Sequence, residues 1–191
     1  MATFDLTDPG FALPSSLVPD SSLLLALRKD DDNPQAGAAY RFIERIGQEI
    51  AERKIIVWLL APVLQECYHI ILSRSLRRSW AAMPVSERPP NWLATYKQQP
   101  ELLSAGFADL TTFDEILASI PVTPVFPRDF DNAQSSNSLE KRMLHFITAY
   151  YLLPQDALIL AEAERIGVSA VATLDSDWRR VKEFDIYTVL P

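Results

Sequence analysis

The stretch LPQDALILAEAERIGVSAVATLDSDWRRVKEFDIYTV, residues 153–189, decides the fold of this chain of 191 residues. Pro154 stands at the first position of a helix, where proline is favoured. An apolar strand at 169–174 follows that helix and ends at Asp175, and a short helix then leads to a last strand at 186–190. This alternation of helices and strands predicts a parallel sheet with right-handed crossovers.

The first third of the chain repeats the same pattern. An apolar strand at 17–19 ends at Asp20, which is placed to cap the helix behind it. Apolar residues recur with helical spacing over 38–52, and the run IIVWLLA at 55–61 is apolar without alternation, as in a strand covered on both faces. Pro62 then opens another helix. The predicted fold is Rossmann-like, a three-layer α/β/α domain with a central parallel sheet of about five strands.

The remaining segments indicate the domain organisation. A capping-box pattern predicts a helix at 112–120, and prolines confine the run at 121–126 to a sheet edge. Residues 1–14 are expected to form an N-terminal arm, and residues 15–191 a single domain. This domain carries an insertion at 79–119 that contains several prolines and tryptophans.

Composition places the chain among ordinary globular proteins, with 48% hydrophobic and 23% charged residues. The single cysteine, Cys67, excludes an internal disulfide and fits a reducing compartment. The N-terminus shows no export signal and the apolar runs are too short to cross a bilayer, so we expect a cytoplasmic protein without membrane contact. The net charge of −7 argues against nucleic-acid binding by the whole surface and leaves room for a local basic strip.

Four acidic residues stand where the predicted strands and helices meet. They are Asp20, Glu66, Asp156 and Asp175, with Asp177 beside the last. Because the carboxyl ends of parallel strands share one edge of a sheet, we expect these acids to converge there. Carboxylates that are crowded together repel each other unless a divalent cation lies among them. The pattern therefore predicts metal-dependent chemistry.

A structural role is open for each of these acids taken singly. The aspartates are placed to cap helices or to complement helix dipoles. Glu66 lies instead at the border of a buried helical stripe, where a glutamate without a partner is rare. It is the set of four that favours a metal site over separate helix caps.

At these residues the chain resembles the PIN-domain family, and especially the VapC-like ribonuclease toxins. The matching segments are LVPDSSLLLAL at 17–27, PVLQECYHIIL at 62–72 and the stretch at 153–189 quoted above. The segment at 153–189 is the most specific for the family, because it joins an Asp-Ala-Leu-Ile helix to a Thr-x-Asp-x-Asp strand end. The resemblance implies an acidic quartet, with a more variable fifth position after it: Asp20, Glu66, Asp156, Asp175 and then Asp177.

The resemblance also implies a chemistry, namely endoribonuclease activity that depends on Mg²⁺ or Mn²⁺. Hard cations of this kind take carboxylate oxygens as ligands. The expected metal ligands are Asp20, Asp156, Asp175 and Asp177. Glu66 would hold a second ion or orient the attacking water, and the sequence leaves open whether one ion or two are bound.

Two hydroxyl-bearing residues are expected to support the acids. Thr173 matches the threonine two residues before the strand-end aspartate, and Ser21 stands where many family members have threonine. Ser22 replaces a frequent asparagine. The implied substrate is single-stranded RNA or a loop of a structured RNA. The implied partners are a small antitoxin protein and a second copy of the chain in a homodimer.

Basic and imidazole side chains have less specific patterns. Arg74, Arg77 and Arg78 share one face of their predicted helix and are candidates for gripping the RNA backbone. A solvated surface explains the same spacing equally well. His69 and His145 lack the spacing of a zinc site and are interpreted as structural.

The alternative function is a PIN-fold binding or assembly module with weak or no nuclease activity. It would explain the negative net charge and the insertion at 79–119. A melting temperature that does not respond to Mn²⁺ would favour this alternative. Nucleotide binding by a glycine-rich loop is excluded, because the five glycines form neither G-x-G-x-x-G nor a P-loop.

Overall fold

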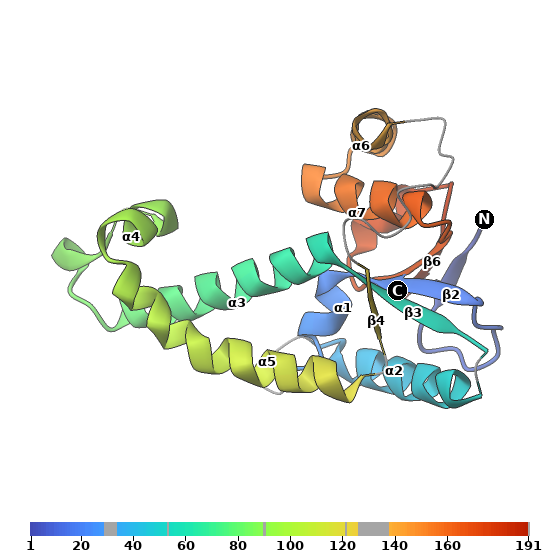
Figure 1. The fold of residues 1–191 in the computed structure, drawn as a ribbon, viewed down its shortest axis with the longest axis horizontal. Coiled ribbons are helices and arrows are strands. Elements are labelled where there is room, and N and C mark those ends of the chain that lie inside the picture. The colour runs from blue at the N-terminus through green and yellow to red at the C-terminus, as the bar shows by residue number, and fades with distance from the viewer. Residues whose placement is uncertain (29–33, 53, 90, 121, 126–137, 191) are drawn as a thin grey trace. The chain divides into compact units, whose positions relative to one another are not determined.

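In the computed structural model the chain forms two compact units (Figure 1). Unit 1 comprises Met1–Leu64 and Ile120–Pro191, and unit 2 comprises Gln65–Ser119. The structure describes residues 1–28, 34–52, 54–89, 91–120, 122–125 and 138–190. Within these ranges, no helix combines the length and the apolar character needed to cross a bilayer.

Unit 1 is built on a parallel sheet, which has six strands in the described part of the chain, in the order β1-β6-β5-β2-β3-β4. Every strand pairing is parallel. The predicted parallel sheet flanked by helices is therefore confirmed. The strands are β1 Thr3–Asp5, β2 Ser16–Pro19, β3 Ile56–Leu60, β4 Thr123–Val125, β5 Ala170–Ala172 and β6 Asp185–Thr188.

The helices of unit 1 cover both faces of this sheet, with α1 and α2 on one face and α7 on the other (Figure 1). The chain moves from β2 to β3 through α1 and α2, and returns from β4 to β5 through α6 and α7. Right-handed crossovers that run in opposite directions along a sheet place their helices on opposite faces. The helices are α1 Ser21–Leu25, α2 Ala36–Ala51, α6 Leu139–Tyr150, α7 Pro154–Arg165 and the 3₁₀ turn η3 Ser176–Arg180.

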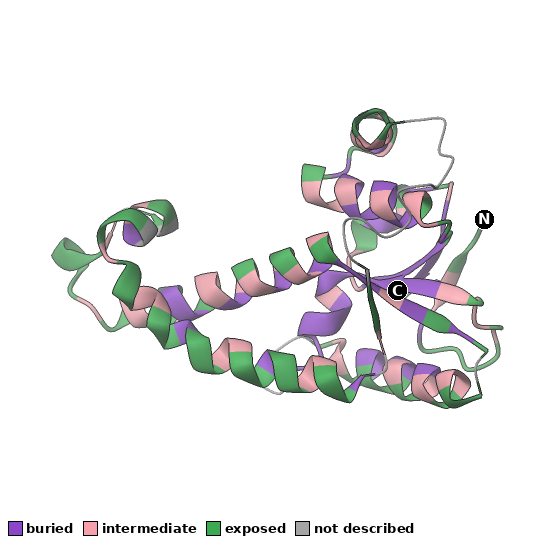
Figure 2. Cartoon of the chain, viewed as in Figure 1, coloured by how far each residue is buried: buried purple, intermediate pink, exposed green. Residues whose placement is uncertain are grey.

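The core of unit 1 lies between the sheet and these helices. Figure 2 shows buried positions concentrated on the strands and on α1. The central strands β2 and β5 are apolar without alternation, because both of their faces are covered. Trp178 in η3, Phe42 in α2 and Phe146 in α6 are completely enclosed and supply the largest buried side chains of this unit.

The N-terminal residues differ from the expected arm, because Thr3–Asp5 forms strand β1 and pairs with β6. The Phe4 ring stacks on the Tyr187 ring with centroids 4.8 Å apart, and Leu6 is buried. This pairing adds the sixth strand to the sheet. A run of three residues is too short to show the periodicity that identifies a strand, so the sequence pattern does not reveal it.

Strand β4 forms the opposite edge of the sheet, as its prolines predict. Among the described residues it pairs with β3 alone, and Pro124 lies opposite Leu59 in the register. Proline has no backbone N–H, so it is tolerated only where a strand has a neighbour on one side.

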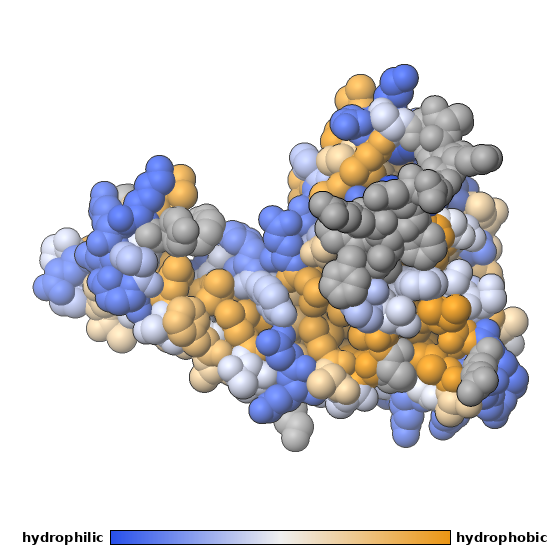
Figure 3. All heavy atoms as spheres, in the orientation of Figure 1, coloured by the Kyte–Doolittle hydropathy of each residue, from blue (hydrophilic) through white to orange (hydrophobic). Residues whose placement is uncertain are grey.

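Unit 2 is helical. Helix α3 spans Ala61–Ala81, beginning directly after β3 and continuing through unit 2. The sequence predicts a helix only from 112, whereas α5 already begins at Phe107 because the 3₁₀ segment η2 runs straight into it. Hydrophilic residues predominate around α4 in the view of Figure 3. The further elements are η1 Val85–Glu87, α4 Trp92–Gln98, η2 Pro100–Gly106 and α5 Phe107–Ser119.

Close packing and polar contacts hold α3 against α5 within unit 2. A Cβ atom at Gly106 would lie 2.9 Å from Leu72 Cδ2, so the backbone approaches α3 where only glycine fits without a shift. The Ser75 hydroxyl donates to a carboxylate oxygen of Asp109 over 2.9 Å. Arg78 forms an ion pair with the same carboxylate. Arg78 therefore has a structural partner in this unit.

Candidate functional site

The centre of the sheet in unit 1 contains a topological switch point. Strands β2 and β5 are neighbours, and the chain leaves β2 toward β3 but leaves β5 toward β6. Connections that diverge in this way open a crevice at the carboxyl ends of the two strands, where α/β proteins bind ligands. Asp20 directly follows β2, and Thr173 and Asp175 follow β5.

Asp20 is the buried acid at this crevice, with a residue exposure of 3%. It caps helix α1, as predicted, by accepting the Ser22 backbone N–H. Its Oδ2 atom accepts the hydroxyls of Ser22 over 2.7 Å and Thr173 over 2.8 Å. Its Oδ1 atom has a longer contact of 3.4 Å to the Ser21 hydroxyl. Capping and participation in a site therefore coexist in one side chain.

Burial raises the pKa of Asp20 above its ordinary value. The hydroxyls of Ser22 and Thr173, together with backbone N–H groups of the first turn of α1, act in the opposite direction by stabilising the charged form. Every one of these partners is a neutral donor. The charge of the ionised carboxylate is therefore solvated by dipoles and remains available to attract a cation.

The end of β5 brings a second acid to the same edge. Asp175 is half-buried, and its backbone N–H donates to the Thr173 hydroxyl over 3.0 Å. Its carboxylate caps η3 by accepting the Asp177 N–H over 2.8 Å. Asp177 itself is exposed and forms an ion pair with Arg180 over 3.1 Å. The Thr173 hydroxyl thus contacts both the backbone N–H of Asp175 and the carboxylate of Asp20. Asp177, by contrast, is paired with a cation, Arg180.

The other two predicted acids lie in helices. Asp156 is half-buried in the first turn of α7, where the sequence predicts it. Its neighbour Gln155 donates from Nε2 to the carbonyl oxygen of Pro62 over 2.9 Å, which fixes the start of α7. Glu66 is half-buried in α3 and belongs to unit 2. Its place in the site stays a prediction.

The donor chemistry of these residues fits a hard divalent cation, because carboxylate and hydroxyl oxygens are the ligands that Mg²⁺ and Mn²⁺ take. Across the residues that the structure describes, however, no three Asp, Glu, His or Cys side chains form a group that could hold a metal ion as they stand. The structure therefore supplies suitable donors at one edge without a closed cluster, and the metal assignment of Asp20, Asp156, Asp175 and Asp177 stays a prediction.

The contact of Ser22 with Asp20 was not predicted, although the sequence shows Ser22 in place of a frequent asparagine. The Ser22 hydroxyl lies 2.7 Å from Asp20 Oδ2, whereas the hydroxyl of Ser21, the expected supporting residue, lies 3.4 Å from Asp20 Oδ1. Thr173 donates its hydroxyl to the same carboxylate, and its supporting role stays a prediction. The sequence feature that could have indicated this role of Ser22 is a second hydroxyl two residues after a strand-end aspartate. This is a common capping pattern and does not by itself indicate a functional site.

The three arginines on one face of α3, Arg74, Arg77 and Arg78, differ in their surroundings. Arg78 is engaged with Ser75 and Asp109 inside unit 2. Arg74 and Arg77 are exposed on the same helix, and their part in RNA binding stays a prediction.

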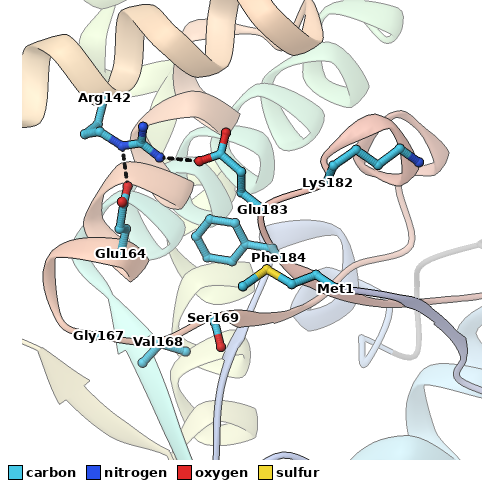
Figure 4. A pocket seen from close by; sticks show the side chains of 9 residues that line it. All are labelled: Met1, Arg142, Glu164, Gly167, Val168, Ser169, Lys182, Glu183 and Phe184. Atoms are coloured by element: carbon cyan, nitrogen blue, oxygen red, sulfur yellow. Dashed lines mark hydrogen bonds and ion pairs between the residues drawn. The ribbon is translucent and has the colours of Figure 1, made fainter.

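A second carboxylate in unit 1, that of Glu183, has surroundings that contrast with those of Asp20. Glu183 precedes β6 and accepts from Arg142 over 2.6 Å and from the Tyr150 hydroxyl over 3.0 Å, and His145 contacts the same carboxylate. Figure 4 shows Arg142 extending to Glu183 and to Glu164 of α7. Burial acts to raise the pKa of Glu183, but the hydrogen bonds from its three partners outweigh burial, and its pKa is lowered. His145 is therefore part of a structural network.

A pocket of about 550 Å³ lies beside this network (Figure 4). Its lining includes Ser169 and Phe184, which directly precede β5 and β6. It therefore opens at the amino ends of these strands, away from Asp20, and none of the predicted site acids lines it.

The fold and the site together define an α/β protein of the Rossmann-like class, with acids at the switch point of its sheet. The chain belongs to the PIN-domain family, whose sequence profile matches residues 17–184. This finding confirms the family to which the sequence motifs point.

Curated protein sequences include no match to the chain. Among solved structures, it is similar to VapBC2 from Rickettsia felis, bound to a DNA fragment from the promoter, with a TM-score of 0.46 and 10% identity over 91% of this chain and 98% of that one. It is also similar to VapC20 of Mycobacterium tuberculosis, a toxin that cleaves the sarcin–ricin loop, with a TM-score of 0.44 and 14% identity over 85% and 92%.

Proposed function

We propose that this protein is a Mg²⁺- or Mn²⁺-dependent endoribonuclease that hydrolyses RNA phosphodiester bonds at the carboxyl edge of its sheet. The observation that carries the proposal is Asp20, a buried carboxylate at the switch point whose partners are neutral donors. Membership of the PIN-domain family supports it. Among the described residues the partners of this buried acid are neutral, which makes its charge costly to keep in a fold, and a cation-binding role accounts for that cost.

Three aspartates are proposed to hold the cation, namely Asp20, Asp156 and Asp175, with Asp177 in support. The chemistry that a bound divalent cation supplies is Lewis acidity toward the scissile phosphate and the attacking water. Glu66 is proposed to orient that water or to bind a second ion. Because carboxylates repel one another without a counter-charge, we expect cation binding to draw the three aspartates closer together.

The biological role that we propose is that of a toxin in a toxin–antitoxin pair, acting in the cytoplasm. Its partners would be the RNA substrate, a small antitoxin protein and a second copy of the chain. Support for this finer role comes from the family and from the motifs at 17–27, 62–72 and 153–189.

Cleavage of RNA in the presence of Mn²⁺ tests the activity. We expect Asp20→Asn and Asp156→Asn each to reduce the cleavage rate by at least about a hundredfold, since removing a metal ligand costs more than the 10–100-fold typical of its supporting residues. Asp8→Asn is the matched control, because Asp8 is an exposed loop residue that accepts the Gly10 N–H. Undiminished cleavage by both site variants would overturn the assignment.

The alternative of a binding or assembly module is favoured by one observation, the lack of a closed group of three acids among the described residues. A module of this kind has no reason to bind a cation. Its melting temperature would stay constant in millimolar Mn²⁺, whereas a nuclease site would be stabilised by the ion.

A further inference from the structure

Two hydroxyl groups connect Asp20 to the end of strand β5. The Ser22 hydroxyl accepts the Leu174 backbone N–H over 2.9 Å and donates to Asp20 Oδ2 over 2.7 Å. The Thr173 hydroxyl accepts the Asp175 backbone N–H over 3.0 Å and donates to the same Oδ2 over 2.8 Å. Two parallel chains therefore run from a backbone amide through a hydroxyl to one carboxylate oxygen.

Counting protons shows which form of Asp20 this arrangement suits. A serine or threonine hydroxyl has one proton to donate, and an ionised carboxylate can only accept. Both hydroxyl protons are used on Asp20 Oδ2, so the 3.2 Å contact between Ser22 Oγ and Thr173 Oγ1 receives none. In each chain the amide polarises the hydroxyl, which strengthens its bond to the carboxylate. The pair is thus arranged to solvate the charged form.

The two oxygens of Asp20 are unequal as a result. Oδ2 receives both short hydroxyl bonds, whereas Oδ1 has the 3.4 Å contact to Ser21. A carboxylate offers about four lone-pair positions, and among the contacts that the described residues make, those of Oδ1 are the longer.

We propose that Ser22 and Thr173 are positioning residues that hold Asp20 through Oδ2 and keep Oδ1 available to a divalent cation. The inference rests on the proposed function and deepens it. The pair also sets the spacing between two predicted ligands, because Thr173 accepts the backbone N–H of Asp175 while donating to Asp20. Partners that orient a ligand in this way typically change metal affinity when they are removed.

The experiment compares the affinity of variants for Mn²⁺ alone, without RNA, by calorimetry and by the rise in melting temperature. Ser22→Ala and Thr173→Val each remove one chain, and we expect each to raise the Kd for Mn²⁺ by roughly 10–100-fold. Thr173→Ser retains the hydroxyl and should restore most of the affinity. Thr148→Val is the control, because Thr148 is exposed on α6 and its hydroxyl only donates to backbone carbonyls of that helix.

A second readout separates positioning from general damage to the fold. In RNA cleavage assays, the Mn²⁺ concentration for half-maximal rate should rise in the two variants while kcat at saturating Mn²⁺ largely recovers. A fall in kcat with unchanged Mn²⁺ affinity would overturn the inference. Ser22 is half-buried, so Ser22→Ala keeps the test open if Thr173→Val does not fold.

The failure of this inference and of the proposed function give different results. If the wild type binds Mn²⁺ and both variants bind it equally well, the positioning role is refuted and the metal site stands. If the wild type itself shows no response to Mn²⁺, the proposed function fails and the role of the pair fails with it.

Discussion

Two carboxylates in unit 1 meet opposite electrostatic surroundings at opposite ends of the strands. Asp20 lies at the carboxyl edge among hydroxyl and amide dipoles, and its pKa is raised by burial. Glu183 lies at the amino edge with Arg142, His145 and Tyr150, which outweigh burial and lower its pKa. The Glu183 carboxylate is already paired with Arg142, which weakens its attraction for an external cation. A carboxylate that is held by dipoles keeps its attraction for an external cation, and this difference separates the candidate site from the scaffold.

The largest expected effect is the response of the two centres to Mn²⁺. At a free concentration of about one hundred times the Kd, the ion should stabilise the wild-type protein by about 2.7 kcal/mol. We expect Asp20→Asn to lose this stabilisation and Glu183→Gln to retain it, as measured by thermal unfolding with and without the ion. A loss in both variants, or in neither, would erase the distinction between the two centres.

The same two substitutions should shift the stability of the metal-free protein in opposite directions. Glu183→Gln weakens the contacts to Arg142 and His145, and because the Glu183 side chain is 34% exposed we expect a loss of about 1–2 kcal/mol. Asp20→Asn removes a buried charge and should raise the free energy of unfolding. Denaturant titrations at neutral pH measure both changes. Destabilisation by Asp20→Asn would show that its dipoles outweigh its burial.

The pH dependence of stability should also have opposite signs at the two centres. A raised pKa in the folded state means that Asp20 contributes most below its ordinary value of 3.8, and that this contribution is lost as the pH rises through the folded pKa. The lowered pKa of Glu183 means that its contribution is present above its ordinary value of 4.5 and is lost as the pH falls through the folded pKa.

Melting temperatures from about pH 2 to pH 7 test this, because the contribution of Glu183 is lost below pH 4.5. The advantage of Asp20→Asn over the wild type should grow with rising pH, and the deficit of Glu183→Gln should shrink with falling pH. If the melting temperatures of the wild type and a variant change with pH in parallel, the pKa shift assigned to the substituted residue is contradicted.

The smallest expected effect comes from Tyr150→Phe, which removes one neutral donor from Glu183 and leaves Arg142 and His145 in place. A single hydrogen bond of this kind contributes about 0.5–1.5 kcal/mol, so the variant should unfold at a slightly lower temperature. RNA cleavage should be unchanged. A marked loss of activity would place the Glu183 network inside the functional machinery.

The sequence predicts the parts of the fold that depend on local patterns. The strand before Asp20 and the helix opening at Pro154 carry clear apolar runs and a capping or proline signal. Strand β1 escapes prediction because a run of three residues has no period, and its identity comes from pairing with β6 at the other end of the chain. Pairing between strands that are far apart in the sequence cannot be recognised from the few residues of β1 alone.

The candidate site shows the same limit. The positions of Asp20 and Asp175 follow from strands that end at a shared edge. The role of Ser22 does not, because its amide donor, Leu174, is 152 residues away in the chain. The Glu183 network was likewise hidden, since its partners lie on α6 and meet it only after folding.

Pro124 at the β4 edge has a consequence for the behaviour of the protein at high concentration. An exposed strand edge can template the addition of a strand from another molecule, which is a route to aggregation. At this edge the ladder is three residues long, and its central residue has no amide hydrogen to offer. In the described part of this edge, Pro124 therefore disfavours growth of the sheet by strand addition. We expect Pro124→Val, which would supply that donor, to increase the tendency of the protein to form fibrils.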